Sequence, residues 1–202
     1  MARSIRAAGF TLGATGLAAV AVGMVALSGA AVAKQNGPPK TVTGTLMKTR
    51  SGTLKPGSTV SASKVGSPRM FFNSSKGFGM ASVGQAEYPV ATADGGKTWK
   101  TNGPYLHLDA AQAPFAVTNI GVGNQKTMFA CCGGQVVDAT GDAGKHWYQA
   151  LLGDTVLSVI APGNGKRLVA VAQNGTGKAT NLVYVSTDGG HHWKLNAKLG
   201  AF

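Results

Sequence analysis

One eight-residue pattern, [S/T]-x-D-x-G-x-x-W, occurs three times in the 202-residue chain, and no other feature of the sequence restricts the fold as strongly. The copies read TADGGKTW, TGDAGKHW and STDGGHHW, and their aspartates, Asp94, Asp142 and Asp188, are 48 and 46 residues apart. A pattern that recurs at nearly constant spacing indicates a repeated supersecondary unit. The chain is therefore expected to contain three copies of one structural unit.

The residue types in the pattern predict a tight turn at each copy. Aspartate oxygens accept hydrogen bonds from nearby backbone N–H groups, and glycine tolerates positive φ. The serine or threonine two positions earlier can add a second local bond. The tryptophan opens the next strand and carries a large apolar area into the core. The residues that carry this prediction are Thr92, Asp94, Gly96, Trp99, Thr140, Asp142, Gly144, Trp147, Ser186, Asp188, Gly190 and Trp193.

This octapeptide resembles the Asp-box, or BNR repeat, of sialidases, sortilin-type receptors and the photosystem II assembly-factor family. In those families the box is a structural corner on the outer rim of a β-propeller blade, away from the active face. The resemblance implies an all-β, propeller-like fold with three four-stranded blades, and box aspartates with a structural role. Apolar and aromatic runs before each box place the blades at about 67–112, 113–153 and 154–202.

Three blades are fewer than a closed propeller needs, because known propellers have about four to eight. Unpaired sheet edges would invite aggregation. The sequence leaves three solutions open. Strands from residues 34–66 could join the tail 196–202 in a degenerate fourth blade, two chains could form a six-bladed homodimer, or the chain could be an open fragment of a larger propeller.

The N-terminus predicts export. Arg3 and Arg6 are followed by an uncharged stretch from Ala7 to Ala33, which is the order of a secretory signal peptide. We expect residues 1–33 to be cleaved and the protein to reach the periplasm or the exterior of a bacterium. The alternative is an uncleaved helix that anchors the chain in the membrane.

Positive charge is concentrated in the segment 34–66, called the basic leader here. The chain has a net charge of +12, and its first acidic residue is Glu87. We expect a Lys/Thr/Ser/Gly-rich leader with edge strands that binds anionic surfaces. It contains no aromatic residue for base stacking, so nucleic acid is not an expected partner. The candidate contacts are Lys34, Lys40, Lys48, Arg50, Lys55 and Lys64.

Enzymatic activity is not predicted. The resemblance to sialidases would require an arginine triad, a Tyr–Glu pair and an acid/base aspartate. Glu87 is the only glutamate, and in a strand it points away from its neighbour Tyr88. We predict no catalytic residue and no cofactor. The expected function is an exported binding or assembly scaffold for a protein or glycan, and the alternative is a small sialidase-related glycan-binding protein or glycoside hydrolase.

Cysteine and histidine pairs are the remaining candidates for chemistry. Cys131 and Cys132 could form a disulfide in an exported protein, or they could be two thiols on opposite faces of a buried strand. His146 and the pair His191–His192 occupy variable box positions, and the sequence shows no third ligand at a suitable spacing. No metal site is therefore predicted.

Overall fold

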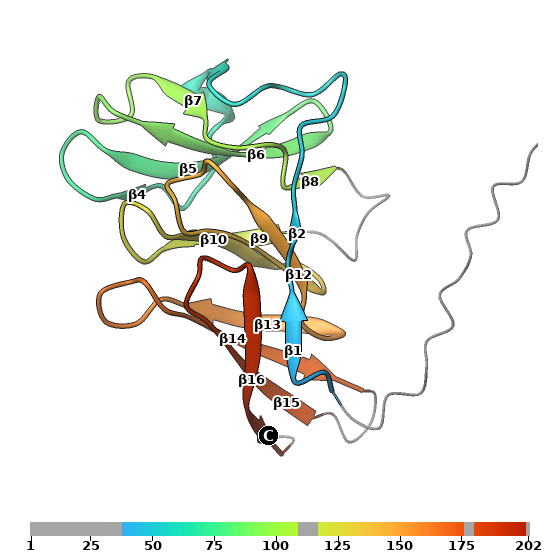
Figure 1. Ribbon diagram of the computed structural model, residues 1–202. Coiled ribbons are helices and arrows are strands. Elements are labelled where there is room, and N and C mark those ends of the chain that lie inside the picture. Colours follow the sequence, from blue (N-terminus) through green and yellow to red (C-terminus); the bar gives the residue numbers. More distant parts are fainter. Residues whose placement is uncertain (1–37, 109–116, 176–179, 201–202) are drawn as a thin grey trace, which may run out of the picture. The chain divides into compact units, whose positions relative to one another are not determined.

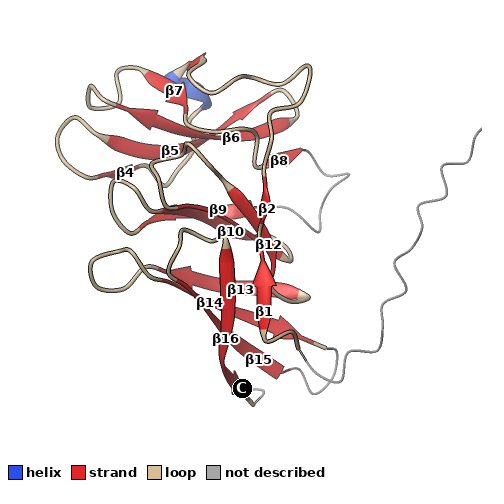
Figure 2. Ribbon diagram, viewed as in Figure 1, coloured by secondary structure: helices blue, strands red, loops and turns tan. Residues whose placement is uncertain are grey.

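Strands account for nearly all regular structure in the part of the chain that the computed structural model describes, residues 38–108, 117–175 and 180–200 (Figure 2). The exception is a short 3₁₀ turn, η1 (Ala62–Lys64). The prediction of an all-β chain is confirmed. No helix among the described residues has the length and apolar character needed to cross a membrane. The predicted signal segment 1–33 lies outside them.

Three antiparallel sheets each contain four strands that are consecutive in sequence, and we number the sheets after the boxes that they carry. Short connections favour this arrangement, because antiparallel neighbours can be joined by tight turns. An extra strand, β8 (His107–Leu108), pairs with β6. The first sheet contains β4 (Met70–Phe71), β5 (Gly77–Val83), β6 (Ala86–Thr92) and β7 (Trp99–Thr101); the second contains β9 (Val117–Val122), β10 (Met128–Cys132), β11 (Val136–Thr140) and β12 (Tyr148–Leu151); the third contains β13 (Thr155–Ile160), β14 (Leu168–Asn174), β15 (Thr180–Ser186) and β16 (His192–Leu199).

The basic leader adds one strand to each of the three sheets. β1 (Thr41–Thr43) pairs with β16, β2 (Thr45–Leu46) pairs with β12, and β3 (Thr59–Val60) pairs with β7. Figure 1 shows β1 and β2 in blue, one after the other along the third and second sheets. The idea that the leader joins the C-terminal tail in a separate fourth sheet is wrong, because its strands are shared among three sheets and β16 extends to Leu199.

Gly44 is the residue at which the leader passes from the third sheet to the second. Its N–H donates to the carbonyl oxygen of His191 at 2.7 Å. A β-carbon at this position would lie 2.7 Å from the carbonyl oxygen of Gly190 and 3.0 Å from Cβ of Tyr148. The close approach of two backbones explains why a glycine separates β1 from β2.

Each box tryptophan packs against the unit that precedes its own sheet. Trp193 lies in the core between the third and second sheets, and Trp147 lies between the second and first sheets, where its ring stacks on Phe78 at 6.1 Å. Within the described ranges no sheet precedes the first one, and Trp99 instead packs with Val60 and Val65 of the leader. The leader therefore covers the face that a preceding sheet would cover.

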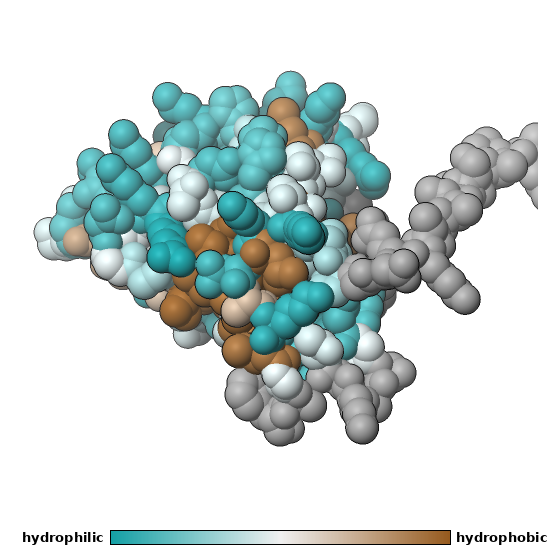
Figure 3. All heavy atoms as spheres, turned by 60° about the horizontal axis from the view of Figure 1, so that its bottom comes forward, coloured by the Kyte–Doolittle hydropathy of each residue, from teal (hydrophilic) through white to brown (hydrophobic). Residues whose placement is uncertain are grey.

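The outer face of the third sheet carries apolar side chains without a covering element among the described residues. Cross-strand pairing places Ile160 beside Val169 and Val169 beside Val185, and the next row pairs Val171 with Val183. The four valines are half-buried, and Ile160 is 57% exposed. Figure 3 shows apolar side chains gathered on the face that is turned toward the viewer there. The two ends of the three-sheet array thus differ in their covering: leader residues pack on the first sheet, whereas no described element covers the outer face of the third.

Candidate functional site

The three boxes share one hydrogen-bond network. In the first box, Thr92 Oγ1 donates to Asp94 Oδ1 at 2.8 Å and accepts the N–H of Gly96 at 2.9 Å. The other end of the turn closes when the N–H of Thr98 donates to Asp94 Oδ1 at 2.9 Å. The same three bonds join Thr140, Asp142, Gly144 and His146 in the second box and Ser186, Asp188, Gly190 and His192 in the third.

Two successive residues in every box have left-handed backbone conformations. They are Gly95 and Gly96 in the first box, with φ of 73° and 88°, and Gly189 and Gly190 in the third. Only glycine adopts this region without a steric cost. The second box has Ala143 at the first of these positions, with φ of 64°. The hydrogen-bond network therefore holds the same turn even where one residue is strained.

The second oxygen of each box carboxylate also has a local partner. Asp94 Oδ2 accepts from Thr98 Oγ1 at 2.6 Å, and the Nδ1 atoms of His146 and His192 lie 2.5 and 2.7 Å from the corresponding oxygens of Asp142 and Asp188. The bonds from Thr98 are the main cause that lowers the pKa of Asp94 to about 2. These carboxylates are engaged within their own turns.

The pKa values of the other two box carboxyls reflect two opposing effects, burial and hydrogen bonding, and hydrogen bonding is the larger in sum. For Asp142, burial is the largest influence and would raise the pKa, yet the hydrogen bonds from His146 and Thr140 together outweigh it and lower the pKa. The same balance, with His192 and Ser186 as donors, lowers the pKa of Asp188. A general base needs a pKa near the working pH, so these groups are poorly suited to that role.

All three box indoles are fully buried, but their N–H groups do not have equivalent partners. Trp99 and Trp193 donate to carbonyl oxygens in their own boxes, Gly96 and Gly190, at 3.0 Å. Trp147 instead donates to the carbonyl oxygen of Asn102 at 2.8 Å. Because Asn102 follows β7, this bond links the second box to the first sheet.

Sequence reasoning missed a second repeated turn that supports the boxes. It lies between the first two strands of each sheet, where Asn73, Asn124 and Asn164 accept backbone N–H groups two or three residues later. The carbonyl oxygens of Ser75 and Lys126 in turn accept the N–H groups of Gly95 and Ala143. The signal was an asparagine followed two or three residues later by Lys76, Lys126 or Lys166.

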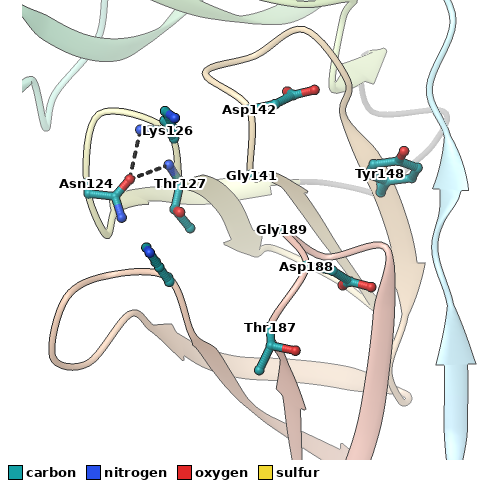
Figure 4. A pocket seen from close by; sticks show the side chains of 10 residues that line it. Asn124, Lys126, Thr127, Gly141, Asp142, Tyr148, Thr187, Asp188 and Gly189 are labelled. Atoms are coloured by element: carbon teal, nitrogen blue, oxygen red, sulfur yellow. Dashed lines mark hydrogen bonds between the residues drawn. The ribbon is translucent and has the colours of Figure 1, made fainter.

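A pocket of about 350 Å³ lies between the second and third boxes (Figure 4). Its charged lining consists of Lys126 and Lys166 from the asparagine turns and Asp142 and Asp188 from the boxes, with Tyr148 beside them. Because both carboxylates already take part in box networks, the pocket does not present a free acid/base pair.

A second pocket, of about 510 Å³, is lined in part by the leader. Lys48, Arg50, Tyr105 and Gln149 supply its polar groups, and the Arg50 guanidinium lies 5.8 Å from the centre of the Tyr105 ring. Among the residues that the structure describes, no carboxylate lines this pocket. It offers an arginine and an aromatic ring, which suit an anionic or glycan ligand.

Asp138 is the one described carboxylate that is both fully buried and without a hydrogen-bond partner. Burial raises its pKa well above the usual value, and the nearby side chain of its cross-strand neighbour Gln149 opposes this shift only in part. The side chain avoids the free-energy cost of a buried charge only if it keeps its proton. Sequence reasoning gave no indication of this site.

The leader's basic residues are spread along the sheet edges. Lys40 lies in a groove with Lys194 and Lys198 of β16, Lys48 and Arg50 line the second pocket, Lys55 precedes β3, and Lys64 ends η1. Lys34 lies outside the described residues. The expected anionic-surface contact thus stays a prediction, and its described basic residues flank the leader strands or lie in η1.

Arg69 and Arg50 contact different parts of the molecule. Arg69 donates to the carbonyl oxygens of Ala62 and Val65 and lies 5.9 Å from the Trp99 ring, whereas Arg50 lies over Tyr105. Arg167 precedes β14 in the third sheet. The described residues do not assemble these arginines into a triad.

Cys131 and Cys132 are joined by a disulfide bond, which is the first of the two alternatives that the sequence leaves open. Cys131 is fully buried in the core between the second and third sheets. Cys132 has a φ of 77°, and the pairing of β10 with β9 shifts its register at this point. The bond thus ends the regular part of β10.

The histidine pair does have a third potential ligand nearby. Ligand atoms of Asp188, His191 and His192 all lie within 4.8 Å of one another. The spacing in the sequence indicates no third ligand, but the box turn brings the aspartate back toward the histidines.

Comparison of the chain with protein-family models, with curated proteins and with solved structures finds no match in any of the three. The candidate sites are therefore interpreted from their own geometry.

Proposed function

We propose that this protein is an exported, non-enzymatic binding or assembly scaffold built from three Asp-box units, which holds a protein or glycan in the cell envelope. The observation that carries the proposal is the apolar outer face of the third sheet. Monomeric proteins rarely leave a contiguous apolar patch uncovered, and such patches mark interaction sites. Here the apolar face runs across three strands and consists of Ile160, Val169, Val171, Val183 and Val185.

We infer that the three sheets are blades of a propeller-like array. Three features support this arrangement: the four strands of each sheet follow in order, the box occupies the same turn in each, and the tryptophans of the second and third boxes pack on the preceding sheet. In such an array the outer face of the third sheet is where a further blade would pack. A second copy of the chain is therefore one candidate occupant.

The box carboxylates argue for a scaffold over an enzyme. Each accepts hydrogen bonds from its own turn on both oxygens, and their pKa values are lowered. This is the behaviour of groups that stabilise a turn. A scaffold or binding protein needs no free acid or nucleophile.

The pocket that holds Arg50 and Tyr105 favours a second candidate, a sialidase-related glycan-binding protein. An arginine beside an aromatic ring can bind a carboxylated sugar through charge and stacking. Binding would require no carboxylate in the pocket, whereas hydrolysis would. Release of the fluorophore from a sialoside substrate by the purified protein would favour the hydrolase form of this alternative.

Replacing Ile160 with lysine is expected to abolish capture of the partner. The side chain is 57% exposed, so the substitution places a charge in the apolar face without removing core packing. Leu151→Lys is the matched control, because Leu151 is 51% exposed on β12 of the second sheet. The measurement is crosslinking and pull-down from the envelope fraction, together with light scattering on the purified chains.

Three outcomes are informative. Loss of a captured protein in Ile160→Lys but not in Leu151→Lys supports a foreign partner on this face. A wild-type dimer that only Ile160→Lys dissociates identifies the occupant as a second copy. If Ile160→Lys captures the same proteins and has the same mass as the wild type, the outer face is not the binding surface.

A further inference from the structure

The third box differs from the other two in having histidines at both variable positions before its tryptophan. Its sequence is STDGGHHW, whereas the first box has Lys97–Thr98 and the second has Lys145–His146 at the same positions. Only here, among the described residues, do three metal-ligating side chains gather within 4.8 Å of one another.

The box turn explains why these side chains meet. Asp188 Oδ2 lies 2.7 Å from Nδ1 of His192, which is the contact that the box network makes at this position in all three copies. His191 precedes β16, so the alternation of side chains along a strand does not separate it from His192. The two imidazole centres are 4.0 Å apart.

Tyr148 holds His191 from the second sheet. The two rings are stacked with their centres 4.4 Å apart and an interplanar angle of 24°. Tyr148 is the first residue of β12 and directly follows the tryptophan of the second box. A ring that is stacked in this way loses little further freedom when its nitrogen binds a ligand.

We propose that Asp188, His191 and His192 form a binding site for Zn²⁺. Two imidazoles and one carboxylate are a zinc ligand set that leaves the fourth tetrahedral position for water. Zinc bonds of about 2.0–2.2 Å would place the ligand atoms about 3.4 Å apart. The side chains of Asp188 and His192 are 43% and 50% exposed, so they have room to make this small adjustment.

The bound ion would hold three residues of the third box together. It would also fix the His191 ring where it stacks on Tyr148 of the second sheet, near the point where Gly44 passes between the two sheets. Binding that requires the folded arrangement of its ligands stabilises the folded state. The site would thus act as a structural clamp whose occupancy depends on zinc in the envelope.

The chain supplies its own control in the second box. His146 and Asp142 form the same pair at 2.5 Å, but Lys145 stands where the third box has His191. The variant His191→Lys therefore gives the third box a residue that the fold already accepts at this position. A second variant, His146→Thr, removes the other exposed box histidine and copies the first box.

The experiment is titration of the full chain, prepared without a histidine tag, with Zn²⁺ in a calorimeter, combined with NMR of the histidine ring protons. We expect one zinc per chain, shifts at His191 and His192 but not at His146, and a zinc-dependent rise in Tm. His191→Lys should lose binding and the zinc-dependent rise in Tm, measured against its own metal-free Tm, and His146→Thr should retain both. Asp188→Asn should weaken binding, because it removes the negative charge from one of the three ligands.

Two results would overturn the proposal. One is zinc binding of equal affinity by the wild type and His191→Lys. The other is an equal response of His146, which would indicate adventitious binding by exposed imidazoles. If Asp188→Asn proves unstable, the comparison of wild type with His191→Lys still decides the question, because that substitution leaves every box hydrogen bond in place.

Discussion

Replacing Trp147 with alanine is expected to lower the free energy of unfolding by about 3–5 kcal/mol, the range for removing a large buried aromatic side chain. The indole is fully buried between the first and second sheets and stacks on Phe78. Its N–H is also the donor to the carbonyl oxygen of Asn102. The substitution therefore removes packing and one hydrogen bond that joins two sheets. Urea-induced unfolding, followed by circular dichroism, measures the loss.

Trp147→Phe separates these two effects. Phenylalanine retains most of the apolar contact but leaves the carbonyl oxygen of Asn102 without its donor, so a smaller loss of about 1–3 kcal/mol is expected. If Trp147→Ala unfolds at the same urea concentration as the wild type, the second box is not an anchor between sheets.

Deleting residues 38–66 is expected to destroy the cooperative fold. The deletion removes β1, β2 and β3, and it thereby exposes unpaired backbone groups on β16, β12 and β7. It also removes Val60 and Val65 from the cluster that covers Trp99. Exposed sheet edges promote aggregation, so the expected product is insoluble or lacks a thermal unfolding transition.

A charge variant tests the leader without removing its strands. Replacing Lys48, Arg50, Lys55 and Lys64 with glutamine should leave the thermal transition close to that of the wild type. Binding to anionic vesicles at low salt should weaken by about 1 kcal/mol for each lost charge that faces the membrane. A soluble, cooperative deletion variant would contradict the structural role of the leader, and unchanged vesicle binding by the charge variant would contradict the electrostatic one.

The sequence predicted those parts of the fold that depend on local chemistry. The box octapeptide contains its own hydrogen-bond donors and acceptors and its own glycines, so the turns around Asp94, Asp142 and Asp188 follow from short-range rules. The strands on either side are apolar or β-branched runs. Local rules were sufficient for these elements because their partners are the next residues along the chain.

The leader's pairings were not predictable in the same way. β2 and β3 contain two residues each, and their partners are far away in the sequence. Thr-rich segments of this length satisfy many registers equally well. Packing selects the register of these strands. Val60 and Val65 fill the space over Trp99, and the absence of a side chain at Gly44 lets the leader pass close to Gly190 and Tyr148.

The candidate metal site was missed for a related reason. Spacing rules for metal ligands assume helices or regular strands, and in a regular strand His191 and His192 would point apart. The box turn reverses the chain between Asp188 and His192, so a ligand four residues away in sequence returns to within hydrogen-bond distance. Asp138 shows the same limit, because alternation alone does not indicate that its partners would be absent.

The central claim is that each box carboxylate accepts hydrogen bonds from its own turn and thereby stabilises that turn. A pH titration of the carboxyl carbons by NMR tests this claim most directly. We expect Asp94 to titrate near pH 2 and Asp142 and Asp188 below the ordinary value of about 3.9. Since these folded-state pKa values lie below the unfolded ones, the stability that the boxes add is present above about pH 4 and is lost as the pH falls toward 2. Three box carboxyls that titrate at the ordinary value would contradict the claim.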